Sequence, residues 1–483
     1  MKTYEKKFRH LTLLTIVLFS VFCSLQVGFA TNHTITDSSN EGIRDGISKV
    51  DNGGTLTLNP GIYDKPGNDV GITIGKSLTI QGNGSPDQVI IDAKSKSRIF
   101  EMANGLNVTF INLTFTNGWT SGSGAAIYNN HPGTVLTFIN CIFVDNNADG
   151  FYGGAIFNKG HNLQVINSTF TNNHVDYGGG AIFNMGHNSY VGGSTFTGNS
   201  AYGGGAIFNY DGTHNMIIVD STFMNNEADS GGAIYYNGNN LYVSGSTFTK
   251  NTANQGGAIT VQNGNNFVVE DSYFIENNAV FGGAFLVHDN VYGLSVASST
   301  FMGNTAEHGN ALYNMGHDST VADSKFLDEY GNIDEGAVSD FGKNLNIVHN
   351  SQNEIQTKEN QDKYLLKHKD ENNLNLNDNV PENYNPDLNN NEESNNVNNK
   401  NQDTNKSDVS NDSNVNSDSE VAYKKVKNHE SKDNAEYNEA DIRNTINDNP
   451  VANSTMKKTG LPLFAIFLVL VSLVGVVFNR RRN

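Results

Sequence analysis

The chain has 483 residues, with 50 acidic and 31 basic side chains and a formal net charge of -19 at pH 7. Only 17% of the residues are charged, while glycine occurs 49 times. Nucleic acid would repel so acidic a chain, so we expect no nucleic-acid binding and favour basic partners or divalent cations.

The first thirty residues are typical of a secretory signal. Basic side chains within the first nine positions precede an apolar run over 11–25, and the small residues Gly28 and Ala30 suit cleavage. We therefore predict a signal peptide over residues 1–30. A retained N-terminal membrane helix is the alternative.

Residues 31–54 are expected to form an N-terminal cap. In the stretch SSNEGIRDGISKV, Ile43, Ile47 and Val50 recur at helical spacing behind Ser and Asn residues that favour helix starts. A β-sheet that ends in the open exposes unpaired backbone groups, so a short helix at this place would cover them.

Residues 55–348 carry a repeat of about 26 residues. The motif GGAI or a close variant begins eight successive copies, and a phenylalanine keeps step with it. Each copy holds three short extended runs separated by turn residues, as in AIFN, LQVIN and STFT. The pattern predicts an all-β fold, a parallel β-helix of about eleven coils that stack into a rod on the order of 50 Å long.

Stacked coils place equivalent residues in columns, which gives the repeat a continuous core. An inward aliphatic column is predicted for Ile127, Ile156, Ile182, Ile207, Ile234 and Ile259. An inward aromatic column is predicted for Phe115, Phe143, Phe170, Phe196, Phe223, Phe248, Phe274, Phe301 and Phe326. A structural ladder of side-chain amides is predicted for Asn146, Asn173, Asn199, Asn226, Asn251, Asn277 and Asn304.

Cys141 stands where most other copies have serine. The second cysteine of the chain, Cys23, would leave with the signal peptide, so no intrachain disulfide is expected. We interpret Cys141 as a small core residue rather than a nucleophile, because no histidine keeps a fixed place beside it.

A column next to the inward isoleucines is the candidate binding surface. It consists of Tyr128, Phe157, Phe183, Phe208, Tyr235, Thr260, Leu286 and Tyr313. Side chains alternate along a strand, so these residues point outward if the isoleucines point inward. The six aromatic members, Tyr128, Phe157, Phe183, Phe208, Tyr235 and Tyr313, could then contact sugars or a partner protein. Two alternatives are that a loop or a neighbouring chain covers the stripe, or that inside and outside are reversed.

Catalysis and metal binding are the competing site hypotheses. The carboxylates that a polysaccharide-cleaving enzyme would need are scattered among the turns: Asp145, Asp149, Asp176, Asp211, Glu227, Asp229, Glu276 and Asp289. No arginine follows Arg98 in the repeats. The recurring histidines His161, His187, His214 and His317 alternate with Asn239 and Asn265, which favours polar turns over a metal site. We therefore predict no catalytic residue, no metal and no cofactor.

Sequons and an Asn-rich segment are the remaining features of the outward-facing chain. The sequons at Asn107, Asn112 and Asn167 are candidate glycosylation sites. Residues 349–459 are rich in Asn, Asp, Ser, Lys and Glu and contain no Phe or Trp, so we predict a disordered spacer.

The C-terminal end is typical of a membrane anchor. Residues 460–479 are predicted to be one transmembrane helix, and the basic residues 480–483 are predicted to be its cytoplasmic tail. This arrangement puts the N-terminus outside and the repeats on the cell surface. A sorting tail that is removed and replaced by another anchor is the alternative.

The motifs resemble those of two groups of surface proteins. GGAI paired with FxxN, as in Gly153 to Ile156 with Phe170 to Asn173, resembles the repeats of chlamydial polymorphic outer-membrane proteins. NGGTLTLNPGIY, SLTIQGNG and NVTFINLTFTNG, together with the Asn-rich tail and the C-terminal helix, are similar to adhesin-like surface proteins of methanogenic archaea. The resemblance covers about residues 38–345. It implies a right-handed parallel β-helix of the pectin-lyase type and attachment to cells or surfaces.

We therefore expect a non-catalytic adhesin-like protein that binds glycans or proteins of another cell or of the envelope. A polysaccharide lyase or hydrolase is one alternative, which clustered carboxylates in a groove would favour. A purely structural protein of the cell envelope is the other.

Overall fold

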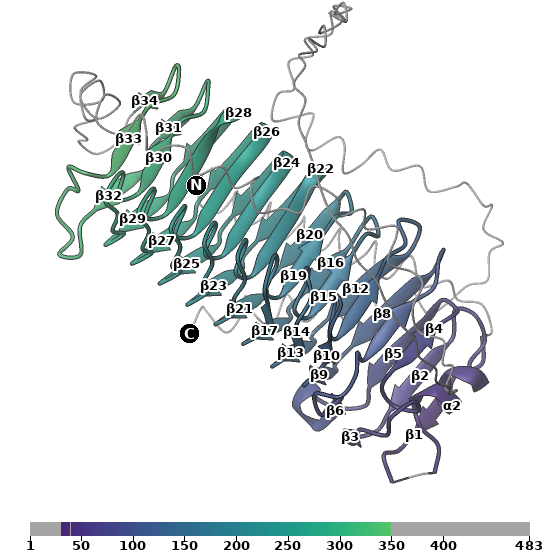
Figure 1. Ribbon diagram of the computed structural model, residues 1–483. Helices are drawn as coiled ribbons and strands as arrows, with labels where there is room; N and C mark the ends of the chain where they lie inside the picture. The colour runs from purple at the N-terminus through teal and green to yellow at the C-terminus, as the bar shows by residue number, and fades with distance from the viewer. Residues whose placement is uncertain (1–29, 39, 349–483) are drawn as a thin grey trace, which may run out of the picture. The chain divides into compact units, whose positions relative to one another are not determined.

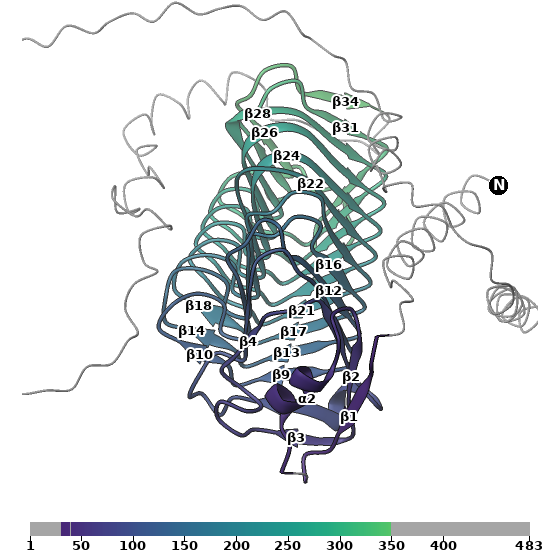
Figure 2. The same cartoon turned by 90° about the vertical axis from the view of Figure 1, so that its right-hand side faces the viewer.

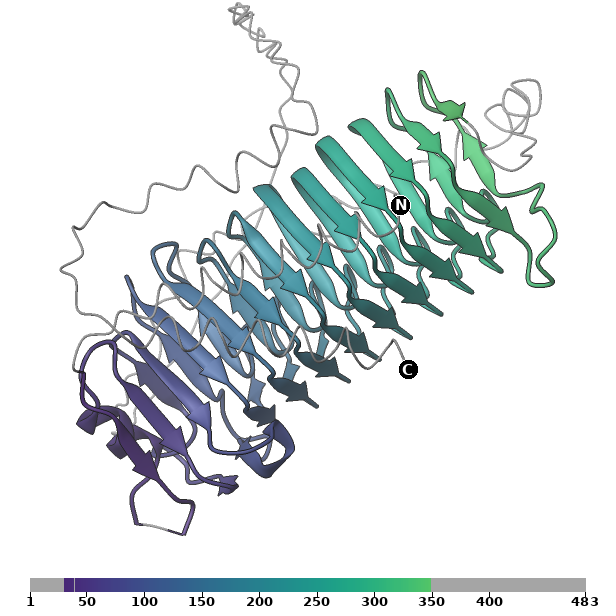
Figure 3. The same cartoon turned by 180° about the vertical axis from the view of Figure 1, so that it is seen from behind.

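The computed structural model describes residues 30–38 and 40–348. They form an all-β, right-handed parallel solenoid of about 12 turns. All ladders between the named strands are parallel, and the coils follow one another as successive rungs (Figure 1, Figure 3). The predicted parallel β-helix is confirmed. Apart from Ala30, the predicted signal peptide lies outside the described residues, as do the spacer, the membrane helix and the tail.

The largest sheet has 20 strands in two rows. The first row follows the GGAI motif and contains β4 (Ile72–Ile74), β7 (Phe100–Met102), β11 (Ile127–Asn129), β15 (Ile156–Asn158), β19 (Ile182–Asn184), β30 (Leu312–Asn314) and β33 (Val338–Asp340). The second row contains β1 (His33–Ile35), β2 (Thr55–Leu58), β5 (Leu78–Gly82), β8 (Asn107–Ile111), β12 (Val135–Ile139), β16 (Gln164–Ile166), β20 (Ser189–Gly192), β31 (Thr320–Ala322) and β34 (Asn346–Val348). Four long strands run through both rows: β22 (Ile207–Val219), β24 (Ile234–Ser244), β26 (Ile259–Glu270) and β28 (Phe285–Ala297).

A second sheet of 11 strands closes the solenoid. It contains β3 (Gly61–Tyr63), β6 (Val89–Asp92), β9 (Thr114–Thr116), β13 (Ile142–Val144), β17 (Thr169–Thr171), β21 (Thr195–Thr197), β23 (Thr222–Met224), β25 (Thr247–Thr249), β27 (Tyr273–Ile275), β29 (Thr300–Met302) and β32 (Lys325–Leu327). A small third sheet, which we call the third ladder, follows it in three successive coils, with β10 (Trp119–Thr120), β14 (Asn147–Ala148) and β18 (His174–Val175). Isolated parallel bridges continue this third ladder from His174 to Thr305.

The predicted inward columns form the core. The isoleucines from Ile127 to Ile259 are fully buried. The phenylalanine rings of the second sheet stack from coil to coil, with centroids 4.7 Å apart for Phe170 and Phe196. The asparagine ladder is confirmed too: each side-chain amide donates to the amide oxygen of the next coil, as from Asn173 to Asn199 at 2.9 Å.

The backbone geometry requires glycine at both glycine positions of the GGAI motif. Gly179 has a φ of +70°, and a Cβ there would lie 2.3 Å from the carbonyl oxygen of Ile182. A Cβ on Gly180 would lie 2.1 Å from the carbonyl oxygen of Gly205 in the next coil. The motif therefore makes a left-handed turn and lets the coils approach closely.

The predicted cap helix is present as α2 (Ile43–Lys49), at the N-terminal end of the solenoid (Figure 2). Ile43 and Ile47 are buried. The helix starts differently from the expectation, because Gly42 is its N-cap and Asp69 accepts a hydrogen bond from the Ile43 N–H at 2.9 Å. Strand β1 also lies within the residues expected to form the cap, and a 3-10 helix, η1 (Pro86–Gln88), precedes β6.

Candidate functional site

The aromatic stripe lies on the outer side of the large sheet, as the sequence predicts. Its rings stack on one another, with centroids 5.1 Å apart for Tyr128 and Phe157 and 4.5 Å apart for Phe208 and Tyr235. The isoleucines that alternate with them belong to the core cluster, whereas Phe157 does not. The interpretation with inside and outside reversed is therefore wrong.

The expected exposure of the stripe is wrong as well. Phe183 is fully buried, and Phe157, Tyr235 and Tyr313 expose 4%, 8% and 3% of their surface. Tyr128 and Phe208 are half-buried. Most of these rings are therefore not available to a ligand in this structure.

The physical reason is that neighbouring turns supply a lid of further rings. Tyr152 lies over Phe183 with a centroid distance of 4.2 Å, and Tyr210 lies 5.7 Å from the same ring. Leu286 and Thr260 are buried in the same outer layer. The alternative in which a loop covers the stripe therefore describes this face.

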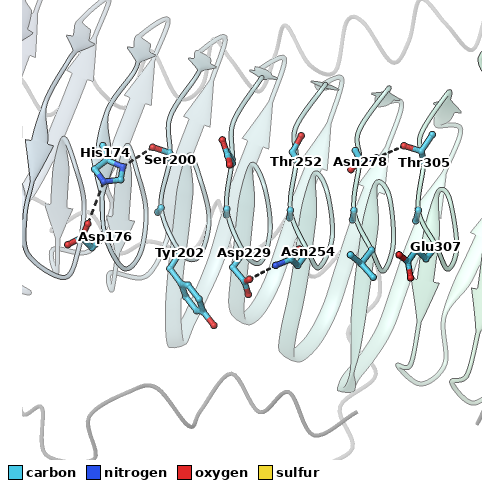
Figure 4. A pocket seen from close by; sticks show the side chains of 17 residues that line it. His174, Asp176, Ser200, Tyr202, Asp229, Thr252, Asn254, Asn278, Thr305 and Glu307 are labelled. Carbon is cyan, nitrogen blue, oxygen red and sulfur yellow. Dashed lines mark hydrogen bonds and ion pairs between the residues drawn. The ribbon is translucent and has the colours of Figure 1, made fainter. Parts of the chain in front are cut away.

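An open groove lies beside this aromatic layer, on the third ladder (Figure 4). It has a volume of about 930 Å³ and spans six successive coils. The first coil contributes His174 and Asp176, and each of the other five contributes the three residues that follow its buried ladder asparagine, with an alanine in the middle. The floor residues are Ala201, Ala228, Ala253, Ala279 and Ala306.

Two rows of larger side chains form the walls of the groove. The first row is His174, Ser200, Glu227, Thr252, Asn278 and Thr305. The second row is Asp176, Tyr202, Asp229, Asn254, Val280 and Glu307. Figure 4 shows the labelled members of these rows on either side of the floor. Neighbouring coils are about 4.8 Å apart, so the groove offers polar groups at regular intervals along the solenoid axis.

The backbone of the floor is held by the coils on either side of it. The N–H of Ala228 donates to the carbonyl of Thr252 at 3.0 Å, and the N–H of Ala253 donates to that of Asn278 at 3.0 Å. The N–H of Thr252 donates in turn to the carbonyl of Asn226 in the buried ladder. The buried asparagines thus fix the place of each groove segment.

Hydrogen bonds between coils order several wall residues. Nδ1 of His174 lies 2.8 Å from Oγ of Ser200, and its Nε2 lies 3.5 Å from a carboxylate oxygen of Asp176. Nδ2 of Asn278 donates to Oγ1 of Thr305 at 2.6 Å. These contacts hold the side chains of the walls in place along the groove.

Tyr202 joins the groove to the aromatic layer. Burial raises the pKa of its phenol, and the neighbouring Asp229 and Tyr177 raise it further, so the hydroxyl stays protonated at neutral pH. Nδ2 of Asn254 donates to Oδ1 of Asp229, one coil earlier, at 2.6 Å. The rings of Tyr202 and Tyr177 lie 6.0 Å apart, and Phe151 beyond them is 38% exposed. One end of the groove therefore combines polar groups with accessible ring edges.

The groove brings together some of the carboxylates that the sequence leaves scattered. Asp176, Glu227 and Asp229 line it, and Glu307, which was not among the candidates, joins them. The other candidates, Asp145, Asp149, Asp211, Glu276 and Asp289, are not among the lining residues. The sequence signal for the groove is the alanine that recurs two positions after the asparagine ladder.

The histidines stack as turn residues. The rings of His161, His187 and His214 have centroids 4.7 and 5.0 Å apart, and the backbone N–H of His187 donates to Nδ1 of His161 at 3.1 Å. Asn239 continues the column through a 3.0 Å contact with Nδ1 of His214. His317 instead lies beside Tyr292. No three His, Cys, Asp or Glu side chains of residues 30–38 and 40–348 are arranged to hold a metal ion.

Cys141 and the sequons occupy different environments. Cys141 is buried and unpaired, as expected for a core residue. Asn107 and Asn167 are exposed and Asn112 is half-buried, while their glycosylation stays a prediction. No helix among the described residues is long and apolar enough to cross a membrane.

One family model matches part of the chain. Residues 97–266 match the family described as a right handed beta helix region. No curated protein matches the sequence. Solved structures with a similar fold include the catalytic domain of a GH87 alpha-1,3-glucanase in complex with nigerose, at 12% identity and a TM-score of 0.44, covering 68% of this chain and 70% of that one.

Two other solved structures share the fold at similar distance. A PL6 alginate lyase in complex with a trisaccharide is 12% identical with a TM-score of 0.41, covering 68% of this chain and 87% of that one. The A-module of the mannuronan C-5 epimerase AlgE6 of Azotobacter vinelandii is 16% identical with a TM-score of 0.36, covering 62% and 86%.

Proposed function

We propose that the protein is a cell-surface, adhesin-like β-helix that binds glycan along the groove on its third ladder, without catalysis. The observation that supports this most is the groove itself. It is long, regular and lined by hydroxyl, amide and carboxylate groups, with Tyr202 at the aromatic end. Concave sites that combine a few ordered polar groups with aromatic surface are typical of small-molecule and sugar recognition.

The groove crosses six successive coils and runs parallel to the solenoid axis. A linear glycan in it would therefore contact the same two walls at every coil. The predicted membrane helix over 460–479 would hold the solenoid at the cell surface, where such a polymer belongs to another cell or to the envelope. The floor and the backbone ladder are fixed before binding, which lowers the entropic cost of ordering the site.

A hydrolase or lyase is the alternative. The carboxylates that line the groove favour it, because such enzymes use carboxyl groups as acids and bases. Hydrolysis needs a carboxylic acid that stays protonated near neutral pH, which proteins achieve by enclosing it in apolar surroundings. Asp176, Glu227 and Glu307 are exposed to solvent and lack such an enclosure. Lysine and arginine, which could stabilise developing negative charge, do not line the groove. We therefore propose binding without turnover.

The test is binding of the purified full chain to a panel of cell-wall glycans at neutral pH, with release of shorter sugars followed in the same samples. We expect retention without cleavage, weakened about tenfold by Tyr202→Ala, which removes an aromatic contact and a hydroxyl donor. Thr197→Ala, on the second sheet, is the matched control and should leave binding unchanged. Release of products would support the enzyme instead. Absence of any binding would favour a purely structural envelope protein.

A further inference from the structure

The walls of the groove carry negative charge and no fixed positive charge. Asp176, Glu227, Asp229 and Glu307 line it, and no lysine or arginine does. Lys250, two positions before Thr252 in the sequence, pairs with Glu276 at 3.3 Å, and His174 at the first coil of the groove lies 3.5 Å from a carboxylate oxygen of Asp176. The groove therefore places four carboxylates along one ligand path, where a positively charged polymer can meet several of them at once.

The shape of the floor argues for a sugar polymer rather than a peptide. An added peptide strand would need unpaired backbone groups, but the N–H groups of Ala201, Ala228, Ala253 and Ala279 already donate to the next coil. A continuous floor of alanines also offers no separate pockets for peptide side chains. Sugar rings can instead lie flat on such a floor, with their substituents directed to the two walls.

Charge and shape together set the class of ligand. We propose that the groove binds a linear glycan that carries free amino groups, whose ammonium groups contact the carboxylates of Asp176, Glu227, Asp229 and Glu307. This proposal rests on the proposed glycan-binding function and adds the substrate class. Uronate or sulfated glycans meet four like charges in the same groove and are excluded. Fully N-acetylated glycans keep the hydroxyl and amide contacts but lose the ion pairs.

The experiment measures the affinity of the full chain for three matched probes: a glucosamine oligomer, the same oligomer fully N-acetylated, and a uronate oligomer of equal length. We expect the amino form to bind at least about tenfold more tightly than the acetylated form, because two or more partly exposed ion pairs form. We also expect that added salt reduces this difference and that the uronate does not bind.

Matched variants assign the effect to the groove. Glu227→Gln and Asp229→Asn should each weaken binding of the glucosamine oligomer about threefold to fivefold, while binding of the acetylated oligomer changes little. Asp145→Asn makes the same change in net charge at an exposed site that does not line the groove, so it should have no effect. An unchanged melting temperature of each variant excludes loss of the fold as the cause.

The outcomes separate this proposal from the proposed function. Equal binding of the amino and acetylated forms would overturn the charge proposal and leave glycan binding intact. Tighter binding of the uronate would overturn it as well. An oligolysine peptide serves as a fourth probe, and if it displaced the glucosamine oligomer at equal charge and concentration, the ligand would be a basic peptide. No binding to any sugar would overturn both proposals.

Discussion

The side-chain amide of Asn173 donates a hydrogen bond to the amide oxygen of Asn199 at 2.9 Å, and the backbone N–H of Asn173 donates to the same oxygen at 3.0 Å. Both residues are fully buried. Nδ2 of Asn199 also lies 3.1 Å from the carbonyl oxygen of Phe170 and donates to it. Nδ2 of Asn199 donates as well to the amide oxygen of Asn226 at 3.0 Å, so one buried side chain joins three successive coils.

Replacing this residue should destabilise the solenoid. Asn199→Ala removes the acceptor of two donors of Asn173 and one donor to the carbonyl of Phe170 in a buried place, and we expect a loss of about 3 kcal/mol in the free energy of unfolding. Urea unfolding would measure it. Asn225→Gly is the control, because Asn225 is exposed with a φ of +54°, which glycine tolerates. Equal stability of both variants would contradict the structural role of the ladder.

Truncating one ring of the stacked phenylalanine column should leave a cavity and destabilise the fold. Phe196 is fully buried between Phe170 and Phe223, with centroids 4.7 and 4.8 Å away. Phe196→Ala should cost about 4 kcal/mol of unfolding free energy, from lost burial and the cavity left behind. Thermal and urea unfolding test this, with Thr197→Ala on the outer side of the same strand as the near-neutral control. A loss below about 1 kcal/mol would mean that the column is not tightly packed.

Cys141 should be chemically inert while the protein is folded. Burial raises the pKa of its thiol to about 12, so it carries almost no thiolate at pH 8. We expect a thiol reagent to label it only after unfolding. Because the folded pKa lies above the unfolded value, the thiol contributes stability at neutral pH that is lost as pH rises above about 8.5.

Serine should replace this cysteine with little change in stability. Ser168 holds the equivalent place one coil on, where its hydroxyl donates to the carbonyl of Ile166 at 2.9 Å. Cys141→Ser should therefore change the unfolding free energy by less than about 1 kcal/mol. Fast labelling of the native protein, or a large loss in the serine variant, would contradict the position of Cys141 in the core.

The buried side chain of His288 should make the folded protein less stable in acid. Burial lowers its pKa to about 4, against the opposing effect of Asp289, and its Nε2 has no hydrogen-bond partner among the described residues. The unfolded chain, with a pKa near 6.5, takes up a proton first as pH falls, so stability present above pH 6.5 is lost on the way to pH 4. We expect a loss of about 2 kcal/mol between pH 7 and pH 5.

The matched variant is His288→Gln, because Gln262 follows Val261 one coil earlier as His288 follows Val287. Comparing urea unfolding at the two pH values isolates the contribution of this side chain. The variant should lose less stability in acid than the parent chain, although the lowered pKa of His187 adds a contribution of the same sign in both. Identical pH profiles would exclude His288 as a source of the acid sensitivity.

The sequence repeat was enough to predict the coils and the buried columns of the core. Ile156 or Phe170 recurs at one place in each coil, and in a stack of coils a recurring apolar residue forms a buried column. The burial of Phe183 was not predictable in this way. It depends on Tyr152 and Tyr210, which come from other positions of the repeat and meet the stripe only in three dimensions.

The groove was missed for a related reason. Its wall residues change from one coil to the next, as with Ser200, Glu227 and Thr252, so only the alanine of the floor recurs in successive coils. Asp176 and Asp229 lie more than fifty positions apart in sequence and gather on one groove only because coils stack. Periodicity locates the residues that repeat, whereas a binding surface is made of the residues that vary.

The most direct test of glycan binding in the groove is to fill the groove and measure the glycan affinity of the full chain. Ala253 lies on the floor and exposes 7% of its surface, so Ala253→Trp would place an indole ring in the path of the ligand. Thr222→Trp on the second sheet is the control for an added ring elsewhere. We predict that Ala253→Trp abolishes binding of the glucosamine oligomer while Thr222→Trp retains it, with both variants folded. Unchanged binding by Ala253→Trp would contradict the groove as the binding site.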